Sequence, residues 1–453
     1  MRIVLLSHYY YPEVGAPQRR WRILNDHLRT AGHDVITVAP HPHYPYPDRD
    51  RFFDSTVGRG RKRVDIRLGG TWDTGVDGER ILRVPYLHSG SSMVRQLLDQ
   101  TVSATGAWSA VVDRLRGRMK PDVIVSTTPA LPFLIAGDAL SRLLRVPHVA
   151  EVRDAWPDLI PEMNLVTGAL GRYLPSSITG RLERDVLPNL FTRAQRRAAV
   201  VVVTTDGFKQ RLEARGVTAE VVRSGVSPAE LAGASGLTAT GAIPVISSEA
   251  ADLSAPSSDT KKGRGGRSGL NLLYVGTVGR SQDLSTAIRA LARTDGVRLR
   301  IVGDGVDAAA LKDDAEINRV PVEFFPQHAG AELAAHWEWA DAGLVSLSPL
   351  ESYEYTVPSK LYSLMARQIP VLGVVAGEAA DIIIGTAAGE VAAPGDVDAV
   401  ASAMTVMRER IESSDAFGQN APGGMEPREW VVRHASAAAM GHGYERILRQ
   451  AIS

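Results

Sequence analysis

The chain contains no cysteine, carries no net charge and lacks any long apolar run. The absence of cysteine excludes disulfides and thiolate chemistry, so a zinc ion would depend on histidines and carboxylates. Equal numbers of basic and acidic residues, 51 of each, argue against a general nucleic-acid binder, because such proteins usually carry a basic excess. No segment approaches the roughly 20 apolar residues that cross a bilayer. These absences favour a cytoplasmic protein that contacts a membrane at most from its surface.

Short runs rich in valine and isoleucine, separated by helix-length segments, recur through both halves of the chain. Such runs indicate parallel strands buried on both faces. A length of 453 residues exceeds what one core usually serves, so two domains are expected. The amino-terminal run is too short for a signal peptide and reads as the first strand. Strands are predicted at 3–7, 35–39, 81–85, 122–126, 148–152 and 200–204, then at 270–276, 299–305, 322–325, 343–347, 370–375 and 389–393.

Two segments lack this pattern. Residues 227–268 are rich in serine, glycine, alanine and proline, which predicts a flexible linker whose last third is disordered. Residues 41–80 contain many prolines and glycines and read as a long loop over one sheet edge. The expected class is therefore α/β, with Rossmann-like doubly wound parallel sheets in domains over 1–226 and 269–426. Two such domains facing each other would bring the carboxyl ends of both sheets into one cleft.

A candidate anion site follows from the stretch in which Pro358 precedes Ser359 and Lys360. A proline at a helix start leaves neighbouring N–H groups unpaired, and the helix dipole adds partial positive charge there. Together with the lysine, these groups favour phosphate as the ligand. The alternative is an ordinary helix on which Lys360 is a solvated surface charge.

Glycines follow the first predicted strand of each half. Gly15 precedes a helix that carries Arg19, Arg20 and Arg22, and either phosphate binding or a solvated face would explain these three arginines. The helix start lacks the G-x-G-x-x-G pattern of dinucleotide-binding proteins, which argues against NAD.

In the second half, Gly276 and Gly279 flank a loop in which Arg280 could hold a diphosphate through paired charged hydrogen bonds. Gly303 ends the next predicted strand. It would either permit close backbone approach to a ligand or simply serve a turn.

The second half contains the ordered motifs "YVGTVGRSQDLSTAI", "LRIVGDG", "VPSKLYSLMARQIPVLG" and "AAGEVAAPGDVDAVASAM", and the first half contains "RDAWPD". In this order and spacing, the motifs resemble glycosyltransferase family 4. The "RDAWPD" and "GTVGRSQDL" stretches are similar to the subgroup that builds bacterial O-antigen, capsule and exopolysaccharide units. The resemblance covers nearly the whole chain apart from 227–268 and 41–80.

The resemblance implies a GT-B fold in which the first domain binds the acceptor, the second binds the donor, and a final helix over about 427–453 returns to the first domain. It implies retaining transfer of a hexosyl or N-acetylhexosaminyl group from a UDP-, GDP- or dTDP-sugar to a cell-envelope glycan or lipid-linked acceptor. Neither a metal nor another cofactor is expected, and nucleic acid is not a partner.

Contact with the inner face of the cell membrane would come from helical stretches at about 92–118 and 168–198, where arginines alternate with apolar residues. Ordinary helices that cover a sheet would look similar.

The resemblance also assigns roles to individual residues. Thr277 and Gln282 stand where the family commonly has arginine and lysine in the diphosphate loop, so Arg280 would have to supply the positive charge that these two positions lack. The expected donor-binding residues are Gly15, Gly276, Gly279, Arg280, Gly303, Ser359, Lys360 and Leu361.

For the chemistry, Asp154 with Arg153 would orient the acceptor or stabilise positive charge at the reacting carbon, unless the two form a structural ion pair. Tyr355 and Ser363 stand at the two positions of the family's Glu-x7-Glu element, and Glu354, one residue away, could take the sugar-contacting role of the first glutamate. Ribose recognition is therefore expected to be weakened or rerouted. A catalytically silent nucleotide- or glycan-binding scaffold and a nucleotide-sugar epimerase are the alternative functions.

Overall fold

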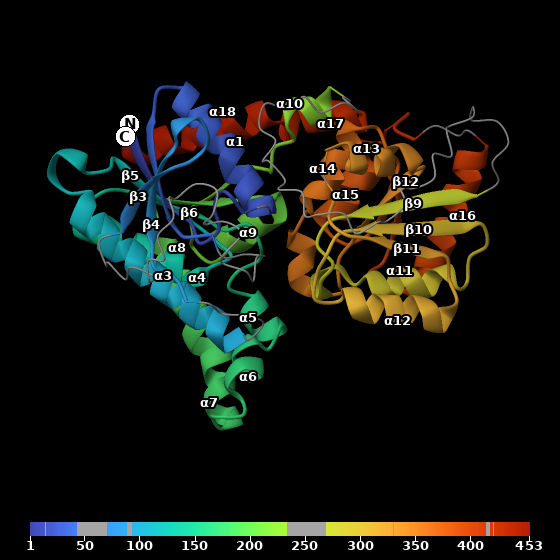
Figure 1. Cartoon of the computed structure of the whole chain (residues 1–453), viewed down its shortest axis with the longest axis horizontal. Coiled ribbons are helices and arrows are strands. Elements are labelled where there is room, and N and C mark those ends of the chain that lie inside the picture. Colours follow the sequence, from blue (N-terminus) through green and yellow to red (C-terminus); the bar gives the residue numbers. More distant parts are fainter. Residues whose placement is uncertain are drawn as a thin grey trace, which may run out of the picture. The chain divides into compact units, whose positions relative to one another are not determined.

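The computed structural model describes residues 1–13, 15–42, 70–87, 93–232, 269–328, 330–413, 417–419 and 421–453. These residues form two compact units, Met1–Gly225 with Ser436–Ser453 and Val226–Ala435 (Figure 1). The predicted linker from residue 233 onward and the predicted loop from 43 to 69 lie outside the described residues. The first residues of that linker form a short helix, α10 (Pro228–Leu231), rather than flexible chain.

The first unit contains an eight-stranded sheet in the order β3-β4-β2-β1-β5-β6-β7-β8. Its strands are β1 (Arg2–Leu6), β2 (Asp34–Pro40), β3 (Thr71–Thr74), β4 (Arg80–Val84), β5 (Val123–Thr127), β6 (His148–Glu151), β7 (Val200–Val203) and β8 (Ala219–Val221). All pairs are parallel except β3 with β4. The six predicted strands are present, but β3 corrects the prediction of a continuous loop over 41–80. All four β3 residues are exposed, so no apolar pattern marks this edge strand.

The second unit contains a six-stranded, fully parallel sheet in the order β11-β10-β9-β12-β13-β14. Its strands are β9 (Leu270–Val275), β10 (Val297–Val302), β11 (Val322–Phe325), β12 (Ala342–Ser346), β13 (Val371–Val374) and β14 (Gly389–Ala392). Each of these strands was predicted from a short, mainly apolar run, the pattern that is typical of parallel strands.

Helices cover both faces of each sheet, as in a doubly wound fold (Figure 1). The helices of the first unit are α1 (Ala16–Thr30), α3 (Met93–Arg114), α4 (Leu131–Leu144), α5 (Leu159–Glu162), α6 (Leu165–Leu170), α7 (Ser176–Arg181), α8 (Leu187–Arg197), α9 (Asp206–Glu213) and α18 (Ala437–Ile452). Alternate residues of β1 separate the two cores: Ile3 and Leu5 pack with α1 and α18, whereas Val4 and Leu6 pack with α3 and α4.

The second unit has its largest core under α11 (Leu284–Leu291), α12 (Ala308–Asn318) and α16 (Val397–Glu412). Its other helices are α10, α13 (Gly330–Trp339), α14 (Ser359–Ala366), α15 (Glu378–Gly385) and α17 (Pro427–His434). Two short 3-10 turns, η4 (Arg280–Gln282) and η5 (Glu351–Tyr355), lie in the loops that follow β9 and β12.

The carboxyl-terminal segment, expected as one helix over 427–453, consists of two helices. α17 packs on α14 in the second unit, and α18 packs on α1 in the first. The break falls at Ser436, whose backbone is extended and whose hydroxyl accepts a hydrogen bond from the N–H of Ala439 at 3.1 Å. This is an N-cap, which starts a new helix rather than continuing the old one.

A buried carboxylate links β6 to α1 and β5 in the first unit. Glu151, at the end of β6, accepts hydrogen bonds from Arg20 Nε at 3.0 Å, Trp21 Nε1 at 2.9 Å and Thr127 Oγ1 at 2.9 Å. Burial alone would raise the pKa of Glu151, but Arg20 and Arg153 hold that pKa below its usual value. Arg20 is therefore neither a solvated residue nor a ready phosphate ligand, which corrects both expectations for it.

We expect Glu151→Ala to lower the free energy of unfolding by about 3–5 kcal/mol, because it leaves the buried guanidinium of Arg20 without its counter-charge. Urea denaturation followed by circular dichroism measures the change. Glu213→Ala, which removes an exposed carboxylate from α9, is the matched control and should change stability by less than about 0.5 kcal/mol. A loss below about 1 kcal/mol for Glu151→Ala would contradict this role.

Candidate functional site

The candidate site lies at the carboxyl ends of β9 and β10 in the second unit. The N–H of Gly276 donates to the carbonyl of Val302 at 3.0 Å. Gly276 and Gly303 adopt φ values of 143° and 152°, which only glycine reaches without strain. A Cβ on Gly303 would overlap the carbonyl oxygen of Gly276. The two strand ends therefore approach closely because both positions lack a side chain.

Lys360 lies beside this glycine pair. A Cβ on Gly276 would sit 3.2 Å from Lys360 Nζ, and the Nζ lies 3.6 Å from the centre of the Tyr274 ring. Burial lowers the pKa of Lys360 to about 7, and no carboxylate among the described residues offsets that effect. An ammonium group in this position gains from the ring, but lacks the counter-charge that usually keeps a buried lysine protonated. A bound anion would supply it.

The helix start adds backbone donors to the lysine. Pro358 immediately precedes α14, and the first-turn N–H groups of Ser359 and Lys360 have no carbonyl partner within the helix. The next N–H, that of Leu361, donates to the carbonyl of Pro358 at 2.9 Å. The Leu361 side chain is completely buried, so this residue packs in the interior instead of presenting a side chain to a ligand.

The loop after β9 is held in place by hydrogen bonds to its neighbours. Tyr274 Oη donates to the carbonyl of Thr277 at 2.6 Å, and Tyr353 Oη, from η5, donates to Ser281 Oγ at 2.7 Å. The N–H of Gly279 donates to Gln282 Oε1 at 3.2 Å. The loop that carries Gly279 is therefore fixed both to its own strand and to η5.

Arg280 and Glu354 occupy exposed positions near this framework. The Arg280 side chain is 87% exposed, and its Nε lies 3.9 Å from Asp307 Oδ1, so the pair is weak. Glu354 is also exposed, while its backbone carbonyl lies so close to Gly377 that a Cβ there would overlap it. Both side chains can therefore reorient toward a ligand without breaking a buried contact.

The remaining predicted residues belong to the first unit. Gly15 is the extended N-cap residue of α1. Arg153 donates to the carbonyl of Thr128 at 2.7 Å, and its Nε lies 3.7 Å from Glu151 Oε1, so it forms an ion pair with Glu151. Burial raises the pKa of Asp154, while Arg153 acts in the opposite direction.

The sequence did not predict two residues near the site. The first is Tyr274, beneath Lys360, which reads from the sequence only as a strand residue. The second is Glu230, whose Oε1 accepts a hydrogen bond from the Ser363 hydroxyl at 3.0 Å, although the two residues are 133 positions apart. The stretch "SPAE" that contains Glu230 has the pattern of a helix capping box, which predicts a helix start and carries no signal of a ligand.

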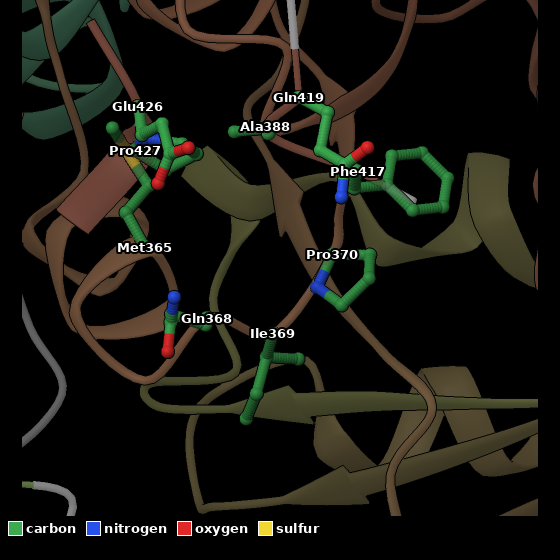
Figure 2. Close-up of a pocket in the computed structure, with 10 residues that line it drawn as sticks. Met365, Gln368, Ile369, Pro370, Ala388, Phe417, Gln419, Glu426 and Pro427 are labelled. Carbon is green, nitrogen blue, oxygen red and sulfur yellow. The ribbon is translucent and has the colours of Figure 1, made fainter. Parts of the chain in front are cut away.

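A separate cavity of about 170 Å³ lies near the amino ends of β13 and β14, between the end of α14 and the start of α17. Figure 2 shows Met365, Ile369, Pro370 and Phe417 on its walls, with Glu426 at one side. Its volume falls below the roughly 300–1,000 Å³ typical of small-molecule sites. We therefore assign it no ligand.

Family comparisons account for most of the chain. Residues 15–224 match the model of a glycosyl transferase 4-like domain, and residues 269–409 match the model of glycosyl transferases group 1. No curated protein matches the chain significantly.

Solved structures resemble the chain over nearly its whole length. Sucrose-phosphate synthase from Thermosynechococcus elongatus is 15% identical with a TM-score of 0.65, and the match covers 99% of this chain and 98% of that one. HepE from Anabaena, solved with UDP-glucose, is 12% identical with a TM-score of 0.61, covering 99% and 100%. WaaG, a glycosyltransferase involved in lipopolysaccharide biosynthesis, is 15% identical with a TM-score of 0.55, covering 96% and 98%. The likeness confirms the predicted GT-B fold.

The unpaired Lys360 makes anion binding depend on pH. We expect the affinity for UDP to fall as pH rises above about 7, by up to tenfold per pH unit, because the free lysine then loses its proton and binding must restore it. Below pH 7 the lysine is already charged and this dependence disappears. The diphosphate does not interfere between pH 7 and 9, since phosphate second ionisations lie near pH 6.

Isothermal titration calorimetry at several pH values measures the effect. Lys360→Met should weaken binding at pH 7 and flatten the profile. Lys312→Met removes an exposed lysine over the Phe324 ring of the same unit, and should leave the profile unchanged. A wild-type affinity that is constant from pH 7 to 9 would contradict the assignment.

Proposed function

Because the chain belongs to the GT-B glycosyltransferases, as a glycosyl transferase 4-like domain followed by a group 1 domain, we propose that it is a retaining enzyme acting on nucleoside diphosphate sugars. It transfers a hexosyl or N-acetylhexosaminyl group from a UDP-, GDP- or dTDP-sugar to a cell-envelope glycan or lipid-linked acceptor. The UDP-glucose bound by the structural relative HepE makes UDP-sugars the first donors to test.

The observation that carries this proposal is the buried Lys360 at the start of α14, next to the Gly276–Gly303 contact. During transfer the bond from the anomeric carbon to the diphosphate breaks, and the leaving diphosphate takes the electron pair. Lys360 and the N–H groups of Ser359 and Lys360 neutralise that charge. Arg280 folds over the diphosphate from its exposed position, and Gly279 lets the loop backbone approach it.

The remaining roles concern the sugar and the acceptor. The acceptor hydroxyl oxygen forms the new bond at the anomeric carbon while positive charge develops there, and its proton passes to the oxygen of the leaving diphosphate. Asp154 stabilises that charge, and Arg153 orients the acceptor. Glu354 contacts the transferred sugar, and Gly15 leaves room for the donor at the start of α1. Leu361 contributes only by fixing the first turn of α14.

A membrane contact fits the exposed surface of the first unit. Large apolar side chains are exposed on α3 and on the α6–α8 segment, of which α6 and α7 extend away from the sheet (Figure 1): Leu97, Leu98, Tyr173, Ile178, Val186 and Leu190. Exposed arginines accompany them, namely Arg95, Arg172, Arg181, Arg184 and Arg193. Apolar side chains among basic groups favour the surface of a bilayer with anionic lipids. Across the part of the chain that the structure describes, every helix is too short or too polar to span a bilayer.

Assays of transfer and donor hydrolysis across UDP-, GDP- and dTDP-sugars test the proposed function. We expect release of nucleoside diphosphate from at least one donor, and a roughly 10²–10³-fold lower turnover for Asp154→Asn with donor affinity nearly unchanged. Asp185→Asn, an exposed residue of the first unit, is the control. Donor binding without any turnover would instead support a silent scaffold, and sugar isomerisation without transfer would support an epimerase. Equal losses of turnover and affinity would make Asp154 a structural residue.

Vesicle sedimentation tests the membrane contact. We expect binding to vesicles of phosphatidylglycerol and phosphatidylcholine, but not to phosphatidylcholine alone, and about tenfold weaker binding for the double variant Tyr173→Ser, Ile178→Ser. The control is Val306→Ser with Ile317→Ser, which removes two even more exposed apolar side chains from the second unit. Equal binding by both double variants would contradict the assignment of this surface.

A further inference from the structure

A glutamate from another helix contacts the face of α14 that carries Lys360. Ser363 follows Lys360 by one helical turn, so their side chains lie on the same face of α14, with Cβ atoms about 5–6 Å apart. Ser363 is almost fully buried, and its hydroxyl donates to Glu230 Oε1 at 3.0 Å. Ser363 stands where the resemblance would place the second glutamate of the Glu-x7-Glu element. Glu230 of α10 therefore brings a carboxylate to the same face of α14.

The Glu230 carboxylate is held in a defined orientation. Its Oε2 accepts hydrogen bonds from the N–H of Ser227 at 3.1 Å and from the Ser227 hydroxyl at 2.9 Å, which forms the capping box of α10. Arg428 of α17 donates to the carbonyl of Leu231 at 2.6 Å, and α10 packs against α14. Local and long-range contacts therefore fix both the backbone and the carboxylate of Glu230.

The charge of Glu230 limits what it can bind. An ionised carboxylate only accepts hydrogen bonds, and it repels phosphate oxygens. A nucleotide whose diphosphate reaches Lys360 therefore has to present a neutral donor group toward Glu230. The vicinal hydroxyls of ribose are such donors, and the Ser363 hydroxyl can accept from one of them while it donates to Glu230.

We propose that Glu230, together with Ser363, recognises the ribose diol of the donor and makes the enzyme selective for ribonucleotide donors, that is UDP- or GDP-sugars over dTDP-sugars. The inference rests on the proposed function, since it assumes a nucleotide at Lys360. It also assigns a role to Ser363: the serine positions the carboxylate and forms part of the diol site.

The affinities of UDP and 2′-deoxy-UDP, measured by isothermal titration calorimetry, test this proposal. The wild type should bind UDP at least about tenfold more tightly than 2′-deoxy-UDP, because the deoxy ligand loses a hydrogen bond to a charged group. Glu230→Gln keeps the capping box, because glutamine also serves at that position. It should reduce the preference to less than about threefold while leaving the affinity for inorganic pyrophosphate unchanged. Glu316→Gln, an exposed residue of α12, is the control and should keep the full preference.

A charge-swap variant provides a second arm. Glu230→Ser with Ser363→Glu moves the carboxylate from α10 to α14 and should restore at least part of the preference for UDP. Equal affinities of UDP and 2′-deoxy-UDP in the wild type, with transfer from UDP-sugars intact, would overturn this inference alone. Full preference in a folded Glu230→Gln variant would do the same. If no nucleotide binds in a Lys360-dependent way, both this inference and the proposed function fail.

Discussion

The close approach of two strand ends is the constraint on which the candidate site depends. Gly303 has no side chain, so the end of β10 can lie against the carbonyl of Gly276 at the end of β9. Lys360 occupies the space beside Gly276, over the ring of Tyr274. Larger residues at either glycine would displace the backbone and the lysine with it. The sheet thus prepares a cationic, partly dehydrated position at its carboxyl edge, where ligands of open α/β sheets bind.

The two units differ in whether a buried charged side chain has a partner of opposite charge. In the first unit, Arg20 and Glu151 neutralise each other, and their hydrogen bonds link α1 to β6. In the second unit, the described residues place an aromatic ring but no carboxylate beside Lys360, and burial lowers its pKa to about 7. Burial without a counter-charge destabilises the charged form of a lysine. Such a lysine is better explained by a ligand than by packing, because groups with strongly shifted pKa values concentrate at functional sites. The paired network supports the fold, whereas the unpaired lysine supports our proposal of a diphosphate site.

Features with a local sequence signal could be predicted, whereas those that arise from tertiary contacts could not. The central parallel strands follow from apolar runs, and the start of α14 follows from Pro358. The edge strand β3 has no apolar residue pattern, and the serine cap that divides 427–453 into two helices resembles any surface serine. The burial of Arg20 and the Glu230–Ser363 hydrogen bond join residues far apart in the chain. Their partners become visible only once the fold brings them together.

A crystal structure of the protein with UDP tests the central claim most directly. The account predicts a β-phosphate oxygen within about 2.7–3.2 Å of Lys360 Nζ and of the N–H of Ser359 or Lys360. A UDP molecule whose diphosphate is bound elsewhere, with Lys360 still resting on Tyr274 and making no contact to phosphate, would contradict it.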